Sequence, residues 1–250
     1  MDRLIEAESL AKTYPGGTVA VRDVSISVRR GELYMLMGLS GSGKSTVLRM
    51  LNRLVEPTSG TVRLDGRDLA ALDDRELRDV RNRRMAMVFQ HFALLPHKSV
   101  RDNAGYGLRI RGAPEPERDE AAQRALAQVG LDRWGDRRPD ELSGGMRQRV
   151  GLARALATGA DILLMDEPFS ALDPLIRREM QDLLLRLRDE IDRTIVFVTH
   201  DLGEAVRLGD RVTLLGDGRV AQTGAPREIL ESPADDYVAR FVAAERGVAL

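Results

Sequence analysis

The chain has 250 residues, of which 43% are hydrophobic and 31% are charged, and its formal net charge is −1. This composition is typical of one globular domain with a large core; the lack of a basic excess argues against nucleic-acid binding, and the absence of cysteine excludes disulfides, thiolate catalysis and cysteine-bound metals. Because the N-terminus lacks a signal-peptide pattern and no apolar run approaches the roughly 20 residues that span a bilayer, we expect any membrane role to be peripheral, through a partner.

The first 90 residues predict strands interrupted by two helices. Short apolar or alternating runs predict strands at residues 4–14, 19–28, 32–37, 61–65 and 85–89. Within the second of these, residues 24–28 alternate between apolar and polar, which favours an antiparallel sheet with one buried face. The third is apolar throughout, as in a strand buried on both faces. A helix after it is expected to run through Leu54 and stop at Pro57, and another spans 73–82.

Residues 90–149 differ in composition from the segments on either side, because they are richer in charge and in helix-forming residues. We expect them to form an inserted helical subdomain, with an amphipathic helix at 121–129 and a loop at 112–116. The alternating pattern then resumes, with strands at 162–165 and 194–198, a helix at 174–192, a hairpin at 212–222 and short helices at 226–230 and 235–243. The sequence therefore predicts one domain whose α/β core covers about 1–89 and 150–250.

Residues 38–45 match the phosphate-loop pattern of Gly, four residues, Gly-Lys-Ser. Glycines let successive N–H groups converge on phosphates, and the following helix adds its dipole. Lys44 is expected to contact the β- and γ-phosphates, and the Ser45 hydroxyl to coordinate Mg²⁺. A chance glycine-rich turn is the weaker interpretation, because the loop joins an apolar strand to a helix. The residues expected to hold nucleotide here are Gly38, Leu39, Ser40, Gly41, Ser42, Gly43, Lys44, Ser45 and Thr46.

Two carboxylates, Asp166 and Glu167, follow the predicted strand at 162–165. An Asp-Glu pair alone is usually a solvated turn, but after a buried strand in a chain with a phosphate loop it favours catalysis. Asp166 is expected to hold Mg²⁺, partly through water, and Glu167 to act as general base on the attacking water. The next segment, 170–173, either caps a helix or contacts a second copy of the chain.

Two more polar residues follow predicted strands. His200 comes after 194–198, where ligands of α/β sheets gather, and is expected to contact the γ-phosphate. The alternative is a histidine at a helix cap formed by Thr199 or Asp201. Gln90 ends the strand at 85–89, and its neutral amide can touch Mg²⁺ and the attacking water.

Three ring-bearing residues allow two interpretations each. Tyr14 precedes a Pro-Gly-Gly turn and either stacks on adenine or is an ordinary strand tyrosine. His91 and His97 suggest a metal site, but no third ligand accompanies them, and we interpret them as surface residues.

A second glycine-rich turn, residues 142–146, opens another helix. The Ser143 hydroxyl with the N–H groups of Gly144 and Gly145 makes this helix start an anion site. Because the chain already has a complete phosphate loop, the favoured ligand is the ATP held by another copy of the same domain.

These residues, in this order, resemble the ATP-binding subunits of ABC transporters over nearly the whole chain. The resemblance implies an α/β P-loop NTPase fold with a RecA-like core, an antiparallel β subdomain and the inserted helical subdomain. It also implies an ATPase coupled to transport, with ATP and Mg²⁺ as cofactors. Two copies would sandwich two ATP molecules, so that Ser143, Gly144, Gly145 and Gln148 contact the partner's ATP. The implied catalytic residues are Glu167, His200 and Gln90, the implied metal ligands are Ser45, Gln90 and Asp166, and Tyr14 would contact adenine.

A narrower resemblance concerns the solute. Residues 89–97, 142–153, 169–177 and 232–238 look like importers of glycine betaine, proline betaine, choline and related compatible solutes. Many members carry C-terminal CBS domains that sense ionic strength, and we expect none here because the sequence stops at Leu250.

The resemblance implies a second copy, transmembrane permease subunits and an extracytoplasmic solute-binding protein as partners, at the cytoplasmic face of the inner or plasma membrane. The alternatives are another importer, for amino acids or other small solutes, and an exporter or lipoprotein-release system. ATPases of DNA repair need long coiled coils or zinc insertions, and translation-associated ATPases need two cassettes, so neither class fits.

Overall fold

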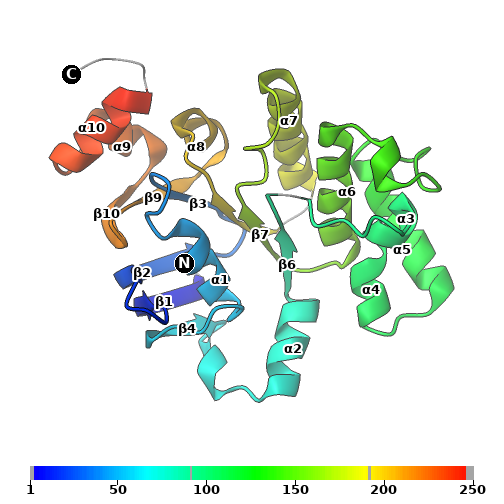
Figure 1. The fold of residues 1–250 in the computed structure, drawn as a ribbon, viewed down its shortest axis with the longest axis horizontal. Helices are drawn as coiled ribbons and strands as arrows, with labels where there is room; N and C mark the ends of the chain where they lie inside the picture. The colour runs from blue at the N-terminus through cyan, green and yellow to red at the C-terminus, as the bar shows by residue number, and fades with distance from the viewer. Residues whose placement is uncertain (1–2, 91, 191–192, 246–250) are drawn as a thin grey trace. The chain divides into compact units, whose positions relative to one another are not determined.

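The computed structural model describes residues 3–90, 92–190 and 193–245, and they form two compact units. The first unit contains the described residues up to Leu77 and from Thr194 onward, and the second contains Arg78–Arg193. Figure 1 labels helices and strands of both units. The sequence-based boundary of a helical subdomain at 90–149 stays a prediction.

An antiparallel sheet forms one layer of the first unit. Its strands are β1 (Arg3–Thr13), β2 (Val19–Arg29), β4 (Ser59–Leu64) and β5 (Arg67–Asp68), in the order β2-β1-β4-β5. Val24 and Val28 are fully buried, whereas Asp23 and Ser25 are exposed. The predicted antiparallel sheet with one buried face is therefore confirmed.

The other sheet of the first unit leads into the phosphate loop. Within this unit its strands are β10 (Arg219–Gly224), β9 (Arg211–Gly216), β3 (Leu33–Met37) and β8 (Thr194–Val198), in that order. Strand β3 pairs parallel with both β8 and β9, and all five of its residues are buried, as the apolar run predicted. The β9–β10 turn carries positive φ at Asp217 and Gly218, which suits a tight hairpin.

Helix α1 (Lys44–Leu51) is shorter than the sequence suggested, and the prediction that it reaches Leu54 is wrong. Local polar bonds end it early. Asn52 Oδ1 accepts from the Leu54 N–H at 3.1 Å, and Arg53 has a φ of 54° with its guanidinium bonded to Glu56. A residue in the left-handed region ends a helix before the proline can.

The remaining helices of the first unit are short. They are the 3₁₀ turn η1 (Leu69–Ala71), α8 (Leu202–Leu208), α9 (Pro226–Glu231) and α10 (Asp236–Glu245), and α2 (Asp74–Arg83) crosses into the second unit. Helix α8 was not predicted, because seven residues give too short a periodic pattern.

The second unit pairs two parallel strands with a group of helices. The strands are β6 (Met85–Val88) and β7 (Ile162–Asp166). Figure 1 shows α3 to α6 gathered together in green. The helical elements are α3 (Val100–Ala104), α4 (Tyr106–Ile110), α5 (Glu115–Gln128), η2 (Pro139–Glu141), α6 (Gly144–Ala157) and α7 (Pro174–Glu190).

Two predictions about these helices were incomplete. Helix α5 begins at Glu115, so the predicted loop at 112–116 is too long, because Pro116 fits the first turn of a helix. Helices α3 and α4 have five residues each and were missed. The predicted helix at 174–192 ends outside the described residues. In the part of the chain that the structure describes, no helix has the length and apolar character to cross a membrane.

Candidate functional site

The phosphate loop places Lys44 inside its own turn. Lys44 is the first residue of α1 and is only 4% exposed. Its Nζ donates to the carbonyl oxygens of Gly38 and Leu39, both at 2.9 Å. The ammonium therefore lies over the loop, where the phosphates of a nucleotide gather in this kind of turn.

Glycine is required in this loop by close backbone approach. A Cβ on Gly43, whose φ is 96°, would lie 2.5 Å from the Ala20 carbonyl oxygen. A Cβ on Gly38 would lie 2.3 Å from a carbonyl oxygen of β9 and 2.5 Å from Ser42 Oγ. Ser42 Oγ is buried and has no hydrogen-bond partner among the described residues. Because a buried hydroxyl is normally bonded, this orphaned group in a glycine cradle fits a phosphate ligand.

Tyr14 packs beside the first turn of α1, the helix that follows the phosphate loop. Its hydroxyl is 3.5 Å from Thr46 Oγ1, and the residue is 36% exposed. Lys12 Nζ is 5.3 Å from the centre of the tyrosine ring. An exposed ring beside a phosphate loop offers a surface on which a purine can stack.

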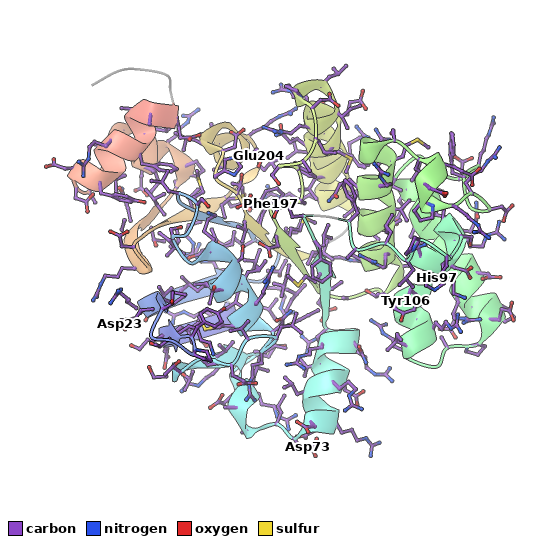
Figure 2. All side chains as sticks on the ribbon, in the orientation of Figure 1. Asp23, Asp73, His97, Tyr106, Phe197 and Glu204 are labelled. Atoms are coloured by element: carbon purple, nitrogen blue, oxygen red, sulfur yellow. The ribbon has the colours of Figure 1, made fainter. Side chains whose placement is uncertain are left out.

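His200 lies at the same sheet edge as the phosphate loop. Strands β3 and β8 are parallel, so Gly38 and His200 follow strand ends on one edge. Of the two possible caps, Asp201 is the one that accepts from an N–H of α8, that of Glu204, at 3.1 Å. Thr199 instead donates its hydroxyl to the Glu204 carboxylate, which Figure 2 labels. His200 is exposed beside this cap, and its contact with a γ-phosphate stays a prediction.

The two carboxylates of the second unit differ in environment. Asp166 ends β7 and is 4% exposed. Glu167 has a φ of 45°, a left-handed conformation that costs a non-glycine residue about 1–3 kcal/mol. The Glu167 carbonyl accepts from the N–H and the hydroxyl of Ser170, at 3.3 and 3.0 Å. Such strain is concentrated at functional sites, which agrees with the predicted importance of Glu167.

The segment after these carboxylates forms a helix cap. Asp173 Oδ1 accepts from the Ile176 N–H at 3.1 Å, at the first turn of α7. The capping interpretation of residues 170–173 is therefore seen within one chain, and the contact with a second copy stays a prediction.

Gln90 and Asp166 lie at the same edge of the β6–β7 pair, where both strands end. The two strands are parallel, with Val88 opposite Met165, and Gln90 is half-buried just beyond. His91 lies outside the described residues, and His97, which Figure 2 labels, is exposed on the loop before α3. Within the described ranges, no group of three or more His, Cys, Asp or Glu residues could hold a metal ion.

Two polar residues hold the segment after Gln90, and sequence reasoning missed both. Arg154 donates to the carbonyl oxygens of Phe92 and Ala93, at 2.9 and 2.6 Å, and burial lowers the pKa of its guanidinium. Asn103 is fully buried; its amide nitrogen donates to three carbonyls of residues 95–99, and its oxygen accepts from the Leu95 N–H. Neither residue had a usable signal: α3, which carries Asn103, is too short for a periodic pattern, and nothing marks Arg154 among so many arginines.

The second glycine-rich turn has an exposed start and a buried continuation. Ser143 is exposed and caps α6, accepting from the Met146 N–H at 3.3 Å. A Cβ on Gly145 would lie 2.4 Å from Ile176 Cγ2, so α6 and α7 require glycine there. Gln148 is 1% exposed, and its Oε1 has no hydrogen-bond partner among the described residues. Gln148 is therefore interior in the single chain, and its contact with another copy's ATP stays a prediction.

A surface groove of about 450 Å³ lies in the second unit. Its walls come from the loop before α3, from the residues around η2 and from α6. They are mainly apolar with two charged side chains, and the lining residues are Phe92, Leu94, Pro96, Pro139, Asp140 and Arg147.

Comparison with known proteins gives consistent matches. A family model described as "ABC transporter" matches residues 21–170. The chain is 56% identical over 238 residues to the glycine betaine/proline betaine transport ATP-binding protein ProV of Salmonella typhimurium, covering 95% of this chain and 59% of ProV. It is 56% identical over 227 residues to the glycine betaine/carnitine transport protein GbuA of Listeria monocytogenes, covering 91% of this chain and 57% of GbuA. The chain thus spans somewhat over half the length of these relatives.

The fold also matches a solved structure of known state. The ATP-binding cassette MJ0796, in a dimeric post-hydrolysis state bound to ADP and Pi, superposes with a TM-score of 0.81 at 37% sequence identity. The match covers 90% of this chain and 99% of that chain. The predicted α/β P-loop fold with an antiparallel β subdomain and inserted helices is therefore confirmed.

Proposed function

The chain belongs to the ABC transporter family, and from that premise we propose that it is the ATP-hydrolysing subunit of an importer for compatible solutes such as glycine betaine. The observation that carries the ATP chemistry is the phosphate loop, with Lys44 over its carbonyls and the orphaned Ser42 hydroxyl in its glycine cradle. The solute class rests on the two relatives, whose solutes share a methylated ammonium group and a carboxylate.

In this proposal the chain's own residues divide the work of phosphoryl transfer. Lys44 and the loop N–H groups bind the β- and γ-phosphates, and Tyr14 orients the adenine. The oxygens of Ser45, Gln90 and Asp166 would hold Mg²⁺, an ion that prefers oxygen ligands, and the bound ion would neutralise part of the phosphate charge. Glu167 accepts a proton from the attacking water, and His200 contacts the γ-phosphate.

A second copy of the chain completes each ATP site in the proposal. The exposed Ser143 and the N–H groups of Gly144 and Gly145 would bind the phosphates held by the partner's loop. Closure of the pair on ATP and its reopening after hydrolysis form a rigid-body switch. The dimeric state of the similar cassette supports this arrangement.

The importer would need membrane and extracytoplasmic partners. The mainly apolar groove lined by Phe92, Leu94 and Pro96 suits a short helix of a permease subunit, which would keep this chain at the cytoplasmic face of the membrane. A solute-binding protein would deliver the solute, and a cage of aromatic side chains is the usual way to hold a quaternary ammonium.

Transport by a reconstituted complex tests the proposal. The chain would be co-purified with its permease and binding protein and placed in vesicles that contain ATP. We expect uptake of labelled glycine betaine that Lys44→Ala abolishes, while Arg124→Ala, on the exposed face of α5, leaves it unchanged. Uptake of an amino acid but not of betaine would overturn the assignment. ATP-driven movement of solute out of the vesicles would also overturn it.

A further inference from the structure

Helix α6 holds the segment after Gln90 at two points. The guanidinium of Arg154 donates to the carbonyls of Phe92 and Ala93, at 2.9 and 2.6 Å. About two turns earlier on the same helix, the guanidinium of Arg147 lies 5.6 Å from the centre of the Phe92 ring. Both the backbone and the side chain of this segment are therefore fixed to α6.

The segment needs these contacts because its backbone is strained. Phe92 and Ala93 have φ values of 60° and 46°, and two successive non-glycine residues in the left-handed region do not persist without support. Two parallel donors of a planar guanidinium satisfy both carbonyls at once. Arg154 is therefore the side chain that selects this turn.

The position of the turn constrains Gln90. Gln90 and Phe92 are two positions apart, a span of at most about 7 Å of extended chain. Arg154 in turn lies about three helical turns beyond Ser143, on the helix that Ser143 caps. A single helix thus connects the residue proposed to contact the chain's own ATP with the turn proposed to contact the partner's ATP.

We propose that Arg154 is a positioning residue: through the Phe92–Ala93 carbonyls it sets the place of Gln90 and ties it to the Ser143–Gly145 turn, so that the two ATP sites of a dimer respond together. This inference rests on the proposed function. Arg154 itself touches neither ATP nor the attacking water. Its effect reaches the reaction only through Gln90.

The first test is the steady-state ATPase activity of the full chain. Arg154→Met removes both donors but keeps the length and apolar stem of the side chain. We expect kcat to fall about 10- to 100-fold, as for a misplaced catalytic group, and hydrolysis to lose its cooperativity in ATP. The affinity of the monomer for a fluorescent ATP analogue should stay unchanged, because the phosphate loop is untouched. Arg154→Lys keeps one charged donor. Its kcat should therefore lie between that of the parent and that of Arg154→Met.

A double-mutant cycle with Gln90→Ala separates positioning from general support. If Arg154 acts through Gln90, then Arg154→Met has little further effect on kcat in a Gln90→Ala background. Additive losses, or an equal loss of ATP affinity, would overturn the inference. Should Arg154→Met fail to fold, Arg154→Lys carries the same cycle.

Arg149→Met is the matched control. Arg149 is on the same helix, but it bonds to the Val129 carbonyl and to Glu179 instead of the segment after Gln90. We expect kcat and cooperativity near those of the parent, and an effect equal to that of Arg154→Met would contradict a specific role. Glu167→Gln separates the two levels of failure. If Glu167→Gln loses ATP turnover but Arg154→Met keeps the kcat of the parent, only the inference about Arg154 is overturned. If Glu167→Gln turns over ATP normally, the proposed function is overturned.

Discussion

The hydroxyl of Tyr14 lies 3.5 Å from Thr46 Oγ1, which places an exposed aromatic ring at the first turn of the helix that follows the phosphate loop. The two residues are far apart in the sequence, and the antiparallel sheet brings them together within the first unit. In the proposed ATP site, this arrangement would separate two parts of nucleotide recognition: the exposed ring would contact the adenine, and the loop would bind the phosphates.

We expect Tyr14→Ala to weaken ATP binding by about 1–3 kcal/mol, the usual range for loss of a base–aromatic stack. Tyr14→Trp should retain most of the affinity, because it keeps a ring in the same place. Titration with a fluorescent ATP analogue measures both. Equal affinity in the alanine variant and the parent would show that Tyr14 is an ordinary strand tyrosine.

Alanine substitutions at two glycines of the phosphate loop can be compared for their effect on the stability of the fold. Gly43 and Gly41 both have positive φ, but a Cβ would contact the Ala20 carbonyl at 2.5 Å only at Gly43 and would meet nothing within 4 Å at Gly41. We expect Gly43→Ala to be less stable than Gly41→Ala by about 1–3 kcal/mol in urea unfolding. Equal midpoints for the two variants would mean that the close approach of β2 does not constrain the loop.

Arginine at Ser143 tests the part of the second copy. Ser143→Arg places a long cation at the exposed start of α6, where we propose that the partner's ATP binds. We expect the variant to bind ATP as a monomer but not to form an ATP-dependent dimer in light scattering. Ser232→Arg, an exposed serine of the first unit, is the control and should dimerise normally. Dimerisation of Ser143→Arg would remove this turn from the site.

The Tyr34 phenol predicts a loss of stability at alkaline pH. Burial raises its pKa above the ordinary value of 10.0, although its hydrogen bond with Thr213 and the nearby Arg211 act in the opposite direction. The folded state therefore holds the proton more tightly than the unfolded state. This stability is present below pH 10 and is lost as the pH rises through the raised pKa.

Urea midpoints measured from about pH 9 to pH 11 should fall more steeply for the parent than for Tyr34→Phe. Some slope should remain in the variant, because burial also raises the pKa of Tyr237. Parallel slopes for the two proteins would show that the Tyr34 proton is not linked to folding.

The buried strands and the phosphate loop could be predicted from the sequence, because each depends on residues that are close together in the chain. Strand β3, its loop and Lys44 follow from an apolar run joined to a fixed glycine spacing, and Asp166 from the end of a second apolar run. The early end of α1 could not be predicted, because it depends on the φ of Arg53 and on its contact with the Leu69 carbonyl.

The support of the candidate site lay beyond sequence reasoning for a different reason. Arg154 and the Phe92 carbonyl come from segments about 60 residues apart, and only tertiary packing of the second unit brings them together. The interior position of Gln148 likewise depends on how α6 packs, and the glycine-rich pattern at 142–146 gave no indication of it.

The most direct measurement of the central claim, that two copies enclose ATP and hydrolyse it with Glu167, is ATP turnover by Glu167→Gln measured together with its light scattering. The account predicts that turnover falls about 10²–10⁴-fold and that ATP converts the variant to a stable dimer. Hydrolysis by Glu167→Gln at the rate of the parent, or a variant that stays monomeric with ATP, would contradict the account.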